Sequence, residues 1–464
     1  MKLCIIGAGY VGLTTGACLA EIGHPVIVTD CDQAKIAALQ RGEIPIYEEF
    51  LDAVVARNQS AGRLQFTTDA PAAIEAADAI FVCVGTPPDH DGKANLAAVE
   101  RVTRQIAECA TGDKLIIGKS TVPVRTADHI RRTLATYTRS GARFQVASNP
   151  EFLREGTGIF DFFHPDRIVV GCDGEPAAAG LREIYRPVVE GAFHCPCHDR
   201  PANQCGWRPP VWLETSTTSA ELIKHAANSF LSLKISYANA IADICELAGA
   251  DALAVLRGIG LDHRIGEAFL RPGLGFGGFC FPKDLSAFLE IAAELGYDFR
   301  LLREVQAINA ERVEIFLRKL RESLWVLEDK TLGVLGLAFK PGTDDIRLSP
   351  AMAVVQALLA RKMRLRVFDP RAMERARREL PAEVIFCDSP EAVAEQAEAV
   401  LILTEWPEFR AAVWPRMKAR MLRPLVLDGR NLFRPDELAR LGFEYVGLGA
   451  GAAAPAPLPA AAAR

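Results

Sequence analysis

The fold is decided at the start of the chain by Lys2-Leu-Cys-Ile-Ile-Gly7-Ala-Gly9-Tyr-Val-Gly12. The apolar run before Gly7 is typical of a buried strand, and an apolar helix pattern follows over 13–22. A second strand is expected over 25–30, where it ends in Asp30. A strand, a Gly-x-Gly-x-x-Gly turn, a helix and an acid about 20 residues downstream together form a dinucleotide-binding Rossmann fingerprint.

The residues of this turn have separate expected roles. Gly7 makes the tight turn, Gly9 lets a pyrophosphate approach the backbone, and Gly12 lets the helix pack closely on the strand. Tyr10 and Val11 stand between them, at the helix N-terminus on which the pyrophosphate would rest. The alternative is a glycine-rich turn in some other α/β protein.

Asp30 predicts the identity of the dinucleotide. Its carboxylate would accept hydrogen bonds from the adenosine ribose and would repel the additional phosphate of NADP, so NAD is the expected cofactor. Lys35 follows closely enough to weaken that preference slightly.

Bulk properties are those expected of a cytoplasmic enzyme. The length of 464 residues suggests two or three domains, and the net charge of −5 gives no indication of nucleic acid or an anionic membrane as partner. We find neither a signal peptide nor a membrane-spanning segment. The 12 cysteines are scattered, several of them in expected strands or helices, and we interpret them as reduced thiols.

Strand and helix patterns alternate through roughly residue 200. Buried strands are expected over 79–85 and 114–118, and the polar residues after them would lie at the carboxyl edge of a parallel sheet. From about residue 219 to 311 the pattern becomes helical, with one unusually long helix over 221–248. A helix of this length between two domains would serve as a spine and as a dimer surface.

A second α/β unit begins at Lys330. Strands are expected over 331–336, 365–369, 399–404 and 424–428, and a helix over 351–360. Asp369 repeats the position of Asp30, but the full glycine fingerprint is missing, so a second nucleotide is expected here, not necessarily a dinucleotide.

We therefore predict an α/β protein in which two Rossmann-like, doubly wound domains are joined by a long-helix central domain. The predicted division is 1–212 for the NAD-binding domain, 213–328 for the central domain, 329–447 for the C-terminal domain and 448–464 for a disordered Ala/Pro-rich tail.

Cys280 lies in the stretch Arg271-Pro-Gly-Leu-Gly-Phe-Gly-Gly-Phe-Cys-Phe-Pro-Lys-Asp284. The thiol follows four glycines and precedes Pro282, which suits the first turn of a helix. A helix N-terminus and the neighbouring Lys283 both favour the thiolate, and Asp284 places a carboxylate one turn away. This pattern indicates a nucleophile, and the alternative is a structural cysteine beside a glycine-rich turn.

These motifs and others in the same order resemble the UDP-glucose 6-dehydrogenases, within the wider UDP-glucose/GDP-mannose dehydrogenase family. The resemblance covers about residues 1–445. It rests on Gly7–Gly12, Val84-Gly-Thr-Pro87, Ser120-Thr-Val-Pro123, Asn149–Gly156, Pro165–Gly171, Ala220–Lys224 with Asn228, Gly273–Gly278 with Cys280, and Phe339-Lys340 with Arg347.

The resemblance implies a four-electron oxidation, in which the C6 alcohol of UDP-glucose becomes a carboxylate with two NAD⁺ used in sequence. Cys280 would add to the intermediate aldehyde to give a thiohemiacetal, which is then oxidised to a thioester and hydrolysed. Lys224 and Asn228 are four residues apart on one helix, so they share a face and could both donate to an oxyanion at C6. For Lys224 the alternative is a solvated helix face.

The resemblance also assigns the remaining site residues. Proton transfer falls to Asp284 and Lys224, thioester hydrolysis to Glu151, and a water or the substrate to Thr121. NAD is expected on Gly7, Gly9, Tyr10, Val11, Gly12, Asp30, Lys35, Thr86, Thr121, Glu155, Lys283 and Arg347. The sugar nucleotide is expected on Glu151, Phe152, Leu153, Glu155, Lys224, Asn228, Arg264, Arg271, Gly273, Phe276, Gly277, Phe339, Lys340 and, more weakly, Arg430. Arg264 would reach the substrate of a neighbouring subunit in a homodimer or larger homo-oligomer.

Two features depart from the family pattern. Phe279 precedes the nucleophile where the family usually has Ser, which adds bulk and removes a hydroxyl beside the thiol. The segment 191–212 is longer than in many bacterial relatives and contains His194-Cys-Pro-Cys197-His198, with Cys205 nearby. Such residues can bind zinc, but the spacing is not that of a regular zinc finger. A metal site and a mobile surface loop with free thiols both remain open, and we assign no metal to the active site.

Two other function classes were weighed. A two-electron hydroxyacid dehydrogenase needs neither the thiol at Cys280 nor the domain after residue 330. A binding module without activity would not need Cys280, Lys224, Asn228 and Asp284 together. The same chemistry on GDP-mannose or a UDP-N-acetylhexosamine stays open, as do the size of the oligomer, the pathway and any allosteric control.

Overall fold

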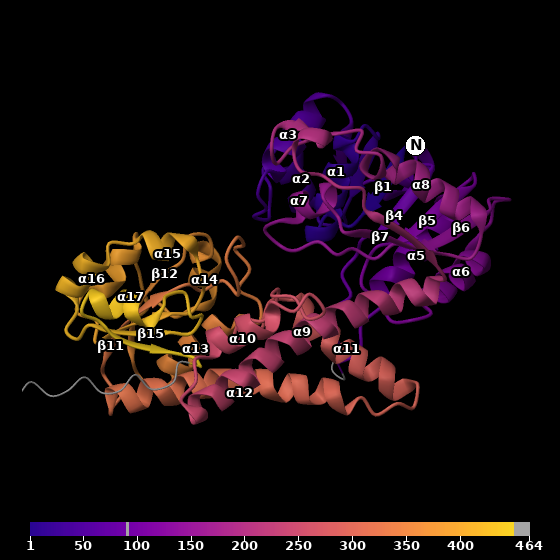
Figure 1. Cartoon of the computed structure of the whole chain (residues 1–464). Helices are drawn as coiled ribbons and strands as arrows, with labels where there is room; N and C mark the ends of the chain where they lie inside the picture. Colours follow the sequence, from indigo (N-terminus) through magenta and orange to yellow (C-terminus); the bar gives the residue numbers. More distant parts are fainter. Residues whose placement is uncertain (90–91, 450–464) are drawn as a thin grey trace, which may run out of the picture. The chain divides into compact units, whose positions relative to one another are not determined.

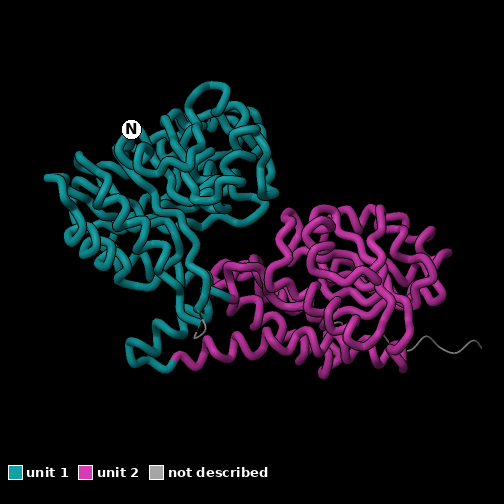
Figure 2. Tube along the Cα trace, turned by 180° about the vertical axis from the view of Figure 1, so that it is seen from behind, with its two compact units in different colours: residues 1–228, 283–298 teal, residues 229–282, 299–464 magenta. Residues whose placement is uncertain are grey.

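The computed structural model describes residues 1–89 and 92–449. This part of the chain divides into two compact units, which Figure 2 distinguishes by colour. The first consists of Met1–Asn228 with Lys283–Asp298, and the second of Ser229–Pro282 with the described part of 299–464. The three-domain division remains a prediction.

The first unit is built on an eight-stranded sheet in the order β10-β7-β6-β5-β4-β1-β2-β3. All neighbouring strands are parallel except β6 and β7. The run β3-β2-β1-β4-β5-β6 is the strand order of a Rossmann domain, as predicted. The strands are β1 (Leu3–Ile6), β2 (Val26–Thr29), β3 (Leu64–Thr67), β4 (Ala79–Val82), β5 (Lys114–Gly118), β6 (Phe144–Ser148), β7 (Arg167–Cys172) and β10 (Val211–Thr215).

Helices cover both faces of this sheet because its strands send alternate apolar residues to opposite sides. Leu3 and Ile5 join the core formed with α1, α3, α7 and α8, whereas Cys4 and Ile6 join the core formed with α4, α5 and α6. The helices are α1 (Tyr10–Glu21), α2 (Gln33–Gln40), α3 (Leu51–Ser60), α4 (Ala70–Ala76), α5 (Ala97–Cys109), α6 (Thr126–Tyr137), α7 (Gly158–Phe163) and α8 (Glu175–Val189).

A small hairpin lies between α8 and β10. It contains the two-residue strands β8 (His194–Cys195) and β9 (Arg200–Pro201), followed by the short 3₁₀ helix η1 (Ala202–Gln204).

Helix α9 (Thr217–Ala248) is the long helix predicted from the sequence, and it begins four residues earlier than expected. Helices α10 (Ala252–Gly260), α11 (Cys280–Glu294) and α12 (Arg300–Leu324) follow it along the chain, and all four are labelled in Figure 1. Both α9 and α11 change from one unit to the other along their length, α9 after Asn228 and α11 after Pro282. Among the described residues, none of the helices combines the length and the apolar character needed to cross a bilayer.

The second unit repeats the Rossmann-like order in a fully parallel six-stranded sheet, β13-β12-β11-β14-β15-β16. Its strands are β11 (Thr331–Leu335), β12 (Arg364–Phe368), β13 (Ile385–Phe386), β14 (Ala399–Ile402), β15 (Leu425–Asp428) and β16 (Glu444–Gly447). Its helices are α13 (Pro350–Leu359), α14 (Met373–Glu379), η2 (Pro390–Ala394), α15 (Pro407–Ala411), α16 (Trp414–Arg420) and α17 (Pro435–Arg440). Two doubly wound sheets and a long helix confirm the predicted fold class.

The predicted tail begins at 448, two residues too early. Leu448 is buried and its N–H donates to Asn431 Oδ1, while the Gly449 N–H donates to Glu246 Oε1. These contacts make both residues part of the fold. Residues 450–464, on which the prediction of disorder falls, lie outside the described residues.

Candidate functional site

The glycine turn has a geometry that fits its predicted roles. Gly7 has a φ of +109°, and a Cβ there would lie 2.6 Å from the Cys83 carbonyl oxygen. A Cβ on Gly12 would overlap the carbonyl oxygen of Gly7, so this helix packs too closely for a side chain. A Cβ on Gly9, the N-cap of α1, would meet no atom within 4 Å. Only Gly9 thus borders open space, where the first N–H groups of α1 can receive a phosphate.

Asp30 is held at the end of β2 by three hydrogen bonds. It accepts from the Ala8 N–H at 2.8 Å, from the Asp32 N–H at 3.0 Å and from Lys35 Nζ at 3.1 Å. Burial alone would favour the protonated acid, but these hydrogen bonds outweigh it and lower the pKa of Asp30. The carboxylate therefore carries its charge beside the glycine turn, and Lys35 neutralises part of it.

The loop 149–156 carries Glu151, Phe152, Leu153 and Glu155, and its end is tied to α1 by Glu48. The buried Glu48 carboxylate accepts from the N–H groups of Gly156 at 2.7 Å and Gly158 at 2.5 Å. Its Oε2 also lies 2.6 Å from the Tyr10 hydroxyl. The side chain of Tyr10 is therefore engaged inside the protein, and a contact with the cofactor would fall to its backbone.

The start of the same loop is fixed by Asn149. Its amide nitrogen donates to the Val169 carbonyl at 2.8 Å, and its oxygen accepts from the Tyr185 hydroxyl at 2.7 Å and from Lys119 Nζ at 3.0 Å. Burial lowers the pKa of Lys119 from 10.5 to about 8. The loop is thus anchored at both ends by buried polar groups.

Thr86 and Thr121 follow the carboxyl ends of β4 and β5. The hydroxyl of the buried Thr86 donates to the Thr121 carbonyl oxygen at 2.8 Å, which ties the two predicted cofactor residues together at this edge of the sheet. Ligands bind at this edge in doubly wound folds.

Glu151 and Lys224 form a buried ion pair. Lys224 Nζ lies 2.9 Å from Glu151 Oε1, and the side chains are 6% and 8% exposed respectively. The other oxygen of Glu151 accepts from the Leu153 N–H at 2.6 Å, and Nζ also lies 5.4 Å from the ring centroid of Phe152. Glu151 thus contacts Lys224 and Leu153, and Lys224 also contacts Phe152.

Asn228 and Asp284 form a second buried pair. The amide nitrogen of Asn228 donates to Asp284 Oδ2 at 2.6 Å, and Lys283 Nζ lies 2.8 Å from Asp284 Oδ1. Asp284 is 2% exposed. This carboxylate is therefore held between an amide donor on α9 and a cation on its own helix.

In the second unit, the glycine-rich segment 273–278 is fixed by two asparagines. Asn239 Oδ1 accepts from the Gly273 N–H at 2.8 Å, and Asn309 both accepts from the Phe276 N–H at 2.8 Å and donates to its carbonyl at 3.1 Å. A Cβ on Gly277 would collide with the Leu348 carbonyl oxygen. The backbone of this segment is consequently held in one shape.

Cys280 is the first residue of α11, and its side chain is exposed. The sequence predicted a thiol near the start of a helix, and the structure places it in the first turn. Asp284 stands four positions further along the same helix, one turn away. Phe279 lies under the guanidinium of Arg347, 4.6 Å from its carbon to the ring centroid. Phe279, which stands where the family usually has Ser, thus contacts Arg347, a residue that is predicted to bind the cofactor.

The other predicted residues of the second unit differ in how firmly they are engaged. Arg430 donates to the carbonyl oxygens of Leu403, Gly275 and Phe339 at 2.9 to 3.0 Å, so it holds segments of the unit together. Arg271 donates to the Asn431 carbonyl at 2.7 Å. Lys340 lies over the Phe339 ring at 5.6 Å, and Arg264 pairs with Asp262 on the surface, where it is 78% exposed.

Three family models match successive parts of the chain. They are the NAD binding domain (residues 1–189), the central domain (218–311) and the UDP binding domain (333–435) of the UDP-glucose/GDP-mannose dehydrogenase family. The chain is 45% identical to the UDP-glucose 6-dehydrogenase of Rhizobium meliloti over 97% of its length and 99% of the relative. The chain belongs to this family.

Other relatives agree with this assignment. The UDP-glucose 6-dehydrogenase TuaD of Bacillus subtilis is 41% identical over 96% of this chain and 92% of its own length. A solved UDP-glucose dehydrogenase from Pyrobaculum islandicum has a TM-score of 0.87 and 38% identity, covering 97% of this chain and 98% of the other. The UDP-D-ManNAc dehydrogenase of Pyrococcus horikoshii has a TM-score of 0.82 and 28% identity, with 97% and 100% covered.

Family membership makes the chain an NAD-dependent dehydrogenase with a nucleotide sugar as substrate class. The residues present fit the cofactor, because Gly9 leaves open space at the N-terminus of α1 and Asp30 provides a charged acceptor beside it. Gly7, Gly9, Gly12 and Asp30 would hold NAD, which supplies a hydride acceptor when it is bound.

Sequence reasoning missed the residues that position the loop 149–156. Glu48 acts on Gly156 across 108 positions, and no local motif surrounds it. Lys119 directly precedes the Ser-Thr-Val-Pro motif, so a lysine at the end of a buried strand was the available signal. Glu48 positions the loop through its backbone N–H groups, and Lys119 positions it through the side chain of Asn149.

Proposed function

We propose that the chain oxidises UDP-glucose to UDP-glucuronate with two NAD⁺ per sugar, through intermediates linked to Cys280. The proposal rests chiefly on an exposed thiol in the first turn of α11, in a chain 45% identical to a UDP-glucose 6-dehydrogenase over nearly its whole length. A two-electron alcohol dehydrogenase has no need of a thiol at this position.

The thiol divides the reaction into two oxidations and a hydrolysis. Each oxidation removes a hydride from C6, which NAD⁺ would accept, and a proton from the hydroxyl oxygen on C6. The Cys280 sulfur adds to the aldehyde from the first oxidation to form a C–S bond, and the second oxidation converts this thiohemiacetal into a thioester. Water then replaces sulfur, which releases the carboxylate and regenerates the thiol. The N-terminus of α11 favours the thiolate that attacks.

The two buried pairs of the first unit supply the proton chemistry. Lys224 and Asn228 are donors on one face of α9 and would stabilise the oxyanion that forms at C6. Asp284 would accept the proton of the C6 hydroxyl or of the water that attacks the thioester, and Glu151 would assist thioester hydrolysis. Thr121, at the end of β5, would orient a water or the substrate.

The stoichiometry of NADH formation tests the proposal. We expect purified protein to form two NADH for each UDP-glucose consumed, with UDP-glucuronate as the product. One NADH per sugar, with an aldehyde or ketone accumulating, would support a two-electron dehydrogenase and overturn the proposal.

A panel of nucleotide sugars tests the substrate. UDP-glucose should have the highest kcat/KM among UDP-glucose, GDP-mannose, UDP-N-acetylglucosamine and UDP-N-acetylmannosamine. Preference for another sugar at two NADH each would retain the chemistry and correct the substrate.

We also propose that the enzyme is a homodimer or larger homo-oligomer through α9. Phe230, Tyr237 and Ile244 follow one another at intervals of seven, so they lie on one face of the helix. Their side chains are 60%, 52% and 59% exposed. An apolar stripe of this kind is expected to be covered by another chain.

The oligomeric state in solution tests this surface. Light scattering should give the mass of a dimer or larger oligomer for the wild type, and Phe230→Glu should lower it. Leu295→Glu is the matched control, because Leu295 is 59% exposed but lies outside α9. A monomeric wild type would refute the proposal.

A cytoplasmic location is supported by the state of the cysteines. None of the 12, all within the described residues, takes part in a disulfide. Several, including Cys4, Cys18 and Cys83, are buried in the first unit, as expected of a protein from a reducing compartment. Fractionation of the producing cells tests this location.

A further inference from the structure

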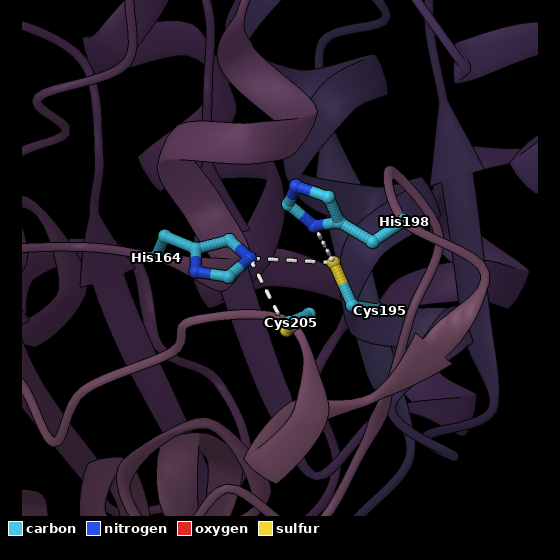
Figure 3. Close-up of side chains that lie close together, drawn as sticks. All are labelled: His164, Cys195, His198 and Cys205. Carbon is cyan, nitrogen blue, oxygen red and sulfur yellow. Dashed lines mark hydrogen bonds between the residues drawn. The ribbon is translucent and has the colours of Figure 1, made fainter.

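Four side chains that can bind a metal meet in the first unit, and none of them is among the residues predicted for the active site. They are His164, Cys195, His198 and Cys205, and their ligand atoms all lie within 4.8 Å of one another. Figure 3 shows the two sulfur atoms and the two imidazoles facing a common point. His164 directly follows α7, and the other three belong to the hairpin between α8 and β10.

The structure selects these four from a larger set of cysteines and histidines. His194 turns toward Asp199 at the surface, where its side chain is 54% exposed. Cys197 packs against the apolar core of the first unit. His164, which is 31 positions from Cys195, completes the group in their place. The irregular spacing in sequence therefore conceals a Cys₂His₂ set in space.

The distances match those of a tetrahedral metal. His164 Nε2 lies 3.3 Å from the sulfur of Cys195 and 3.7 Å from that of Cys205, and His198 Nδ1 lies 3.3 Å from the sulfur of Cys195. Zinc bonds of about 2.3 Å to sulfur and about 2.0 Å to nitrogen place such atoms about 3.5 Å apart in a tetrahedron. A disulfide between the cysteines would require a sulfur separation of about 2.0 Å, and both are free thiols.

Neighbouring groups orient these ligands. The His164 ring stacks on Phe160 with centroids 4.4 Å apart, and the His198 ring meets the same Phe160 edge-on at 6.0 Å. Ligands that are held in place by their neighbours are a common feature of metal sites.

We propose that His164, Cys195, His198 and Cys205 bind one structural Zn²⁺. Two sulfurs and two imidazole nitrogens suit zinc, and they fill its four positions without leaving one for water or substrate. When zinc binds, the thiols of Cys195 and Cys205 lose their protons to solvent. The two thiolates then balance the double positive charge of the ion, which matters because Cys195 is fully buried.

The local fold supports a structural role for the metal. The hairpin has only two residues in each strand, which is too short to be stable by itself. Small loops with little core of their own are frequently held by a metal. His164 directly follows α7, the helix that comes after the loop 149–156. The ion would therefore also join the hairpin to the end of α7.

Metal content of the full-length chain, purified without a histidine tag, tests the site. We expect about one zinc per chain as purified, measured by plasma mass spectrometry. Cys205→Ser and His198→Gln should each lose most of that zinc. His194→Gln is the matched control, since it removes a histidine of the same hairpin from outside the group, and it should retain the metal.

Cobalt provides a second readout that does not depend on the folding of variants. Wild-type protein stripped with a chelator and given Co²⁺ should show the visible bands of tetrahedral cobalt and a thiolate charge-transfer band. Chelation should also lower the melting temperature by several degrees, reversibly on return of Zn²⁺. Zinc below about a tenth per chain, both as purified and after incubation with Zn²⁺, together with octahedral or absent cobalt bands, would overturn the proposal. Loss of zinc in His194→Gln equal to that in His198→Gln would also overturn the ligand set.

Discussion

Lys224 and Asn228 stand one turn apart on α9, and each holds a different buried carboxylate. Lys224 Nζ lies 2.9 Å from Glu151 Oε1, and the Asn228 amide donates to Asp284 Oδ2 at 2.6 Å. The two donors predicted to stabilise an oxyanion therefore also fix the two carboxylates predicted to move protons. This pairing makes the four side chains one unit, and their contributions to activity should not be additive.

The ion pair between Glu151 and Lys224 gives the first prediction. Lys224→Met leaves a carboxylate that is 8% exposed without its cation, which should lower the free energy of unfolding by about 3 kcal/mol. Glu151→Gln should also lower the free energy of unfolding, because it leaves the buried Lys224 ammonium without its carboxylate. The double variant should lose less stability than the two single variants lose together. Urea unfolding of the four proteins gives this coupling energy.

All three variants should also lose at least about a hundredfold in kcat, because the same groups are assigned to the reaction. Additive losses of stability would contradict a direct interaction. Near wild-type turnover in Lys224→Met would contradict the catalytic assignment but not the ion pair.

The second prediction separates binding of NAD from folding. Gly9→Ala adds a methyl group that meets no protein atom within 4 Å, so the melting temperature should stay within a few degrees of the wild type. The methyl group stands where the pyrophosphate approaches, so the Kd for NAD⁺ should rise at least about tenfold. Calorimetric titration with NAD⁺ measures this change.

Two other glycines provide controls for that result. Gly112→Ala also places a Cβ in open space, and it should leave both the melting temperature and the Kd unchanged. Gly12→Ala should prevent correct folding, because its Cβ would overlap the Gly7 carbonyl oxygen. Unchanged affinity for NAD⁺ in Gly9→Ala would place the cofactor elsewhere.

The third prediction concerns the choice between NAD⁺ and NADP⁺. Asp30 Oδ2 accepts the Ala8 N–H, so Asp30→Ala should weaken the glycine turn as well as remove the charge. Asp30→Asn retains an acceptor and removes the charge alone. Both variants should lower the ratio of kcat/KM for NAD⁺ to kcat/KM for NADP⁺. Asp30→Asn should preserve more activity with NAD⁺ than Asp30→Ala does. A wild type that prefers NADP⁺ would show that Lys35 outweighs the carboxylate.

The sequence predicted the parts of the molecule that depend on short spacing. The fingerprint from Gly7 to Asp30, the thiol at the start of α11 and the pairing of Lys224 with Asn228 on one helix face all follow from patterns within about 25 residues. Elements were placed to within a few residues, although β4 ends at Val82, three residues before the predicted end.

Contacts between distant segments could not be predicted in this way. Glu48 contacts Gly156, and His164 contacts Cys195 and Cys205. These pairs meet only because the strands and helices between them pack together in the folded domain. The same limit applies to Arg430, whose guanidinium binds three backbone carbonyls that are far apart in sequence. The resemblance assigned Arg430 weakly to the sugar nucleotide; that role stays a prediction, and the structure adds the three backbone contacts.

The fourth prediction is a pH dependence of stability from Lys119. Burial lowers its pKa from 10.5 to about 8, so below pH 8 the ammonium is charged in both states and the fold bears the full cost of burying it. Between pH 8 and 10.5 the folded state is neutral while the unfolded state is still charged. Raising the pH through this range therefore removes the cost.

The comparison needs Lys119→Met, which cannot titrate. The free energy of unfolding of the wild type minus that of the variant should become more positive between about pH 8 and pH 10. Urea unfolding of both proteins at several pH values isolates this difference from the titration of other groups. A constant difference across the range would mean that Lys119 keeps its usual pKa.

The last prediction assigns the stages of the reaction to residues. Cys280→Ala should bind both ligands with little change but lose about a thousandfold or more in net turnover, because the aldehyde cannot be converted into a thioester. The first oxidation needs no sulfur, so a trace of NADH without UDP-glucuronate is compatible with the assignment. Cys31→Ala, which removes another exposed thiol, is the control and should remain active.

Serine and asparagine variants separate capture of the aldehyde from hydrolysis. Cys280→Ser should allow an ester to form, and since an ester resists hydrolysis more than a thioester, intact-mass spectrometry should detect sugar nucleotide on the protein. Asp284→Asn should slow proton transfer and hydrolysis while ligands still bind. Because serine is the poorer nucleophile, the decisive result comes from Cys280→Ala. If that variant forms UDP-glucuronate at a rate near that of the wild type, sulfur at position 280 takes no part in the chemistry.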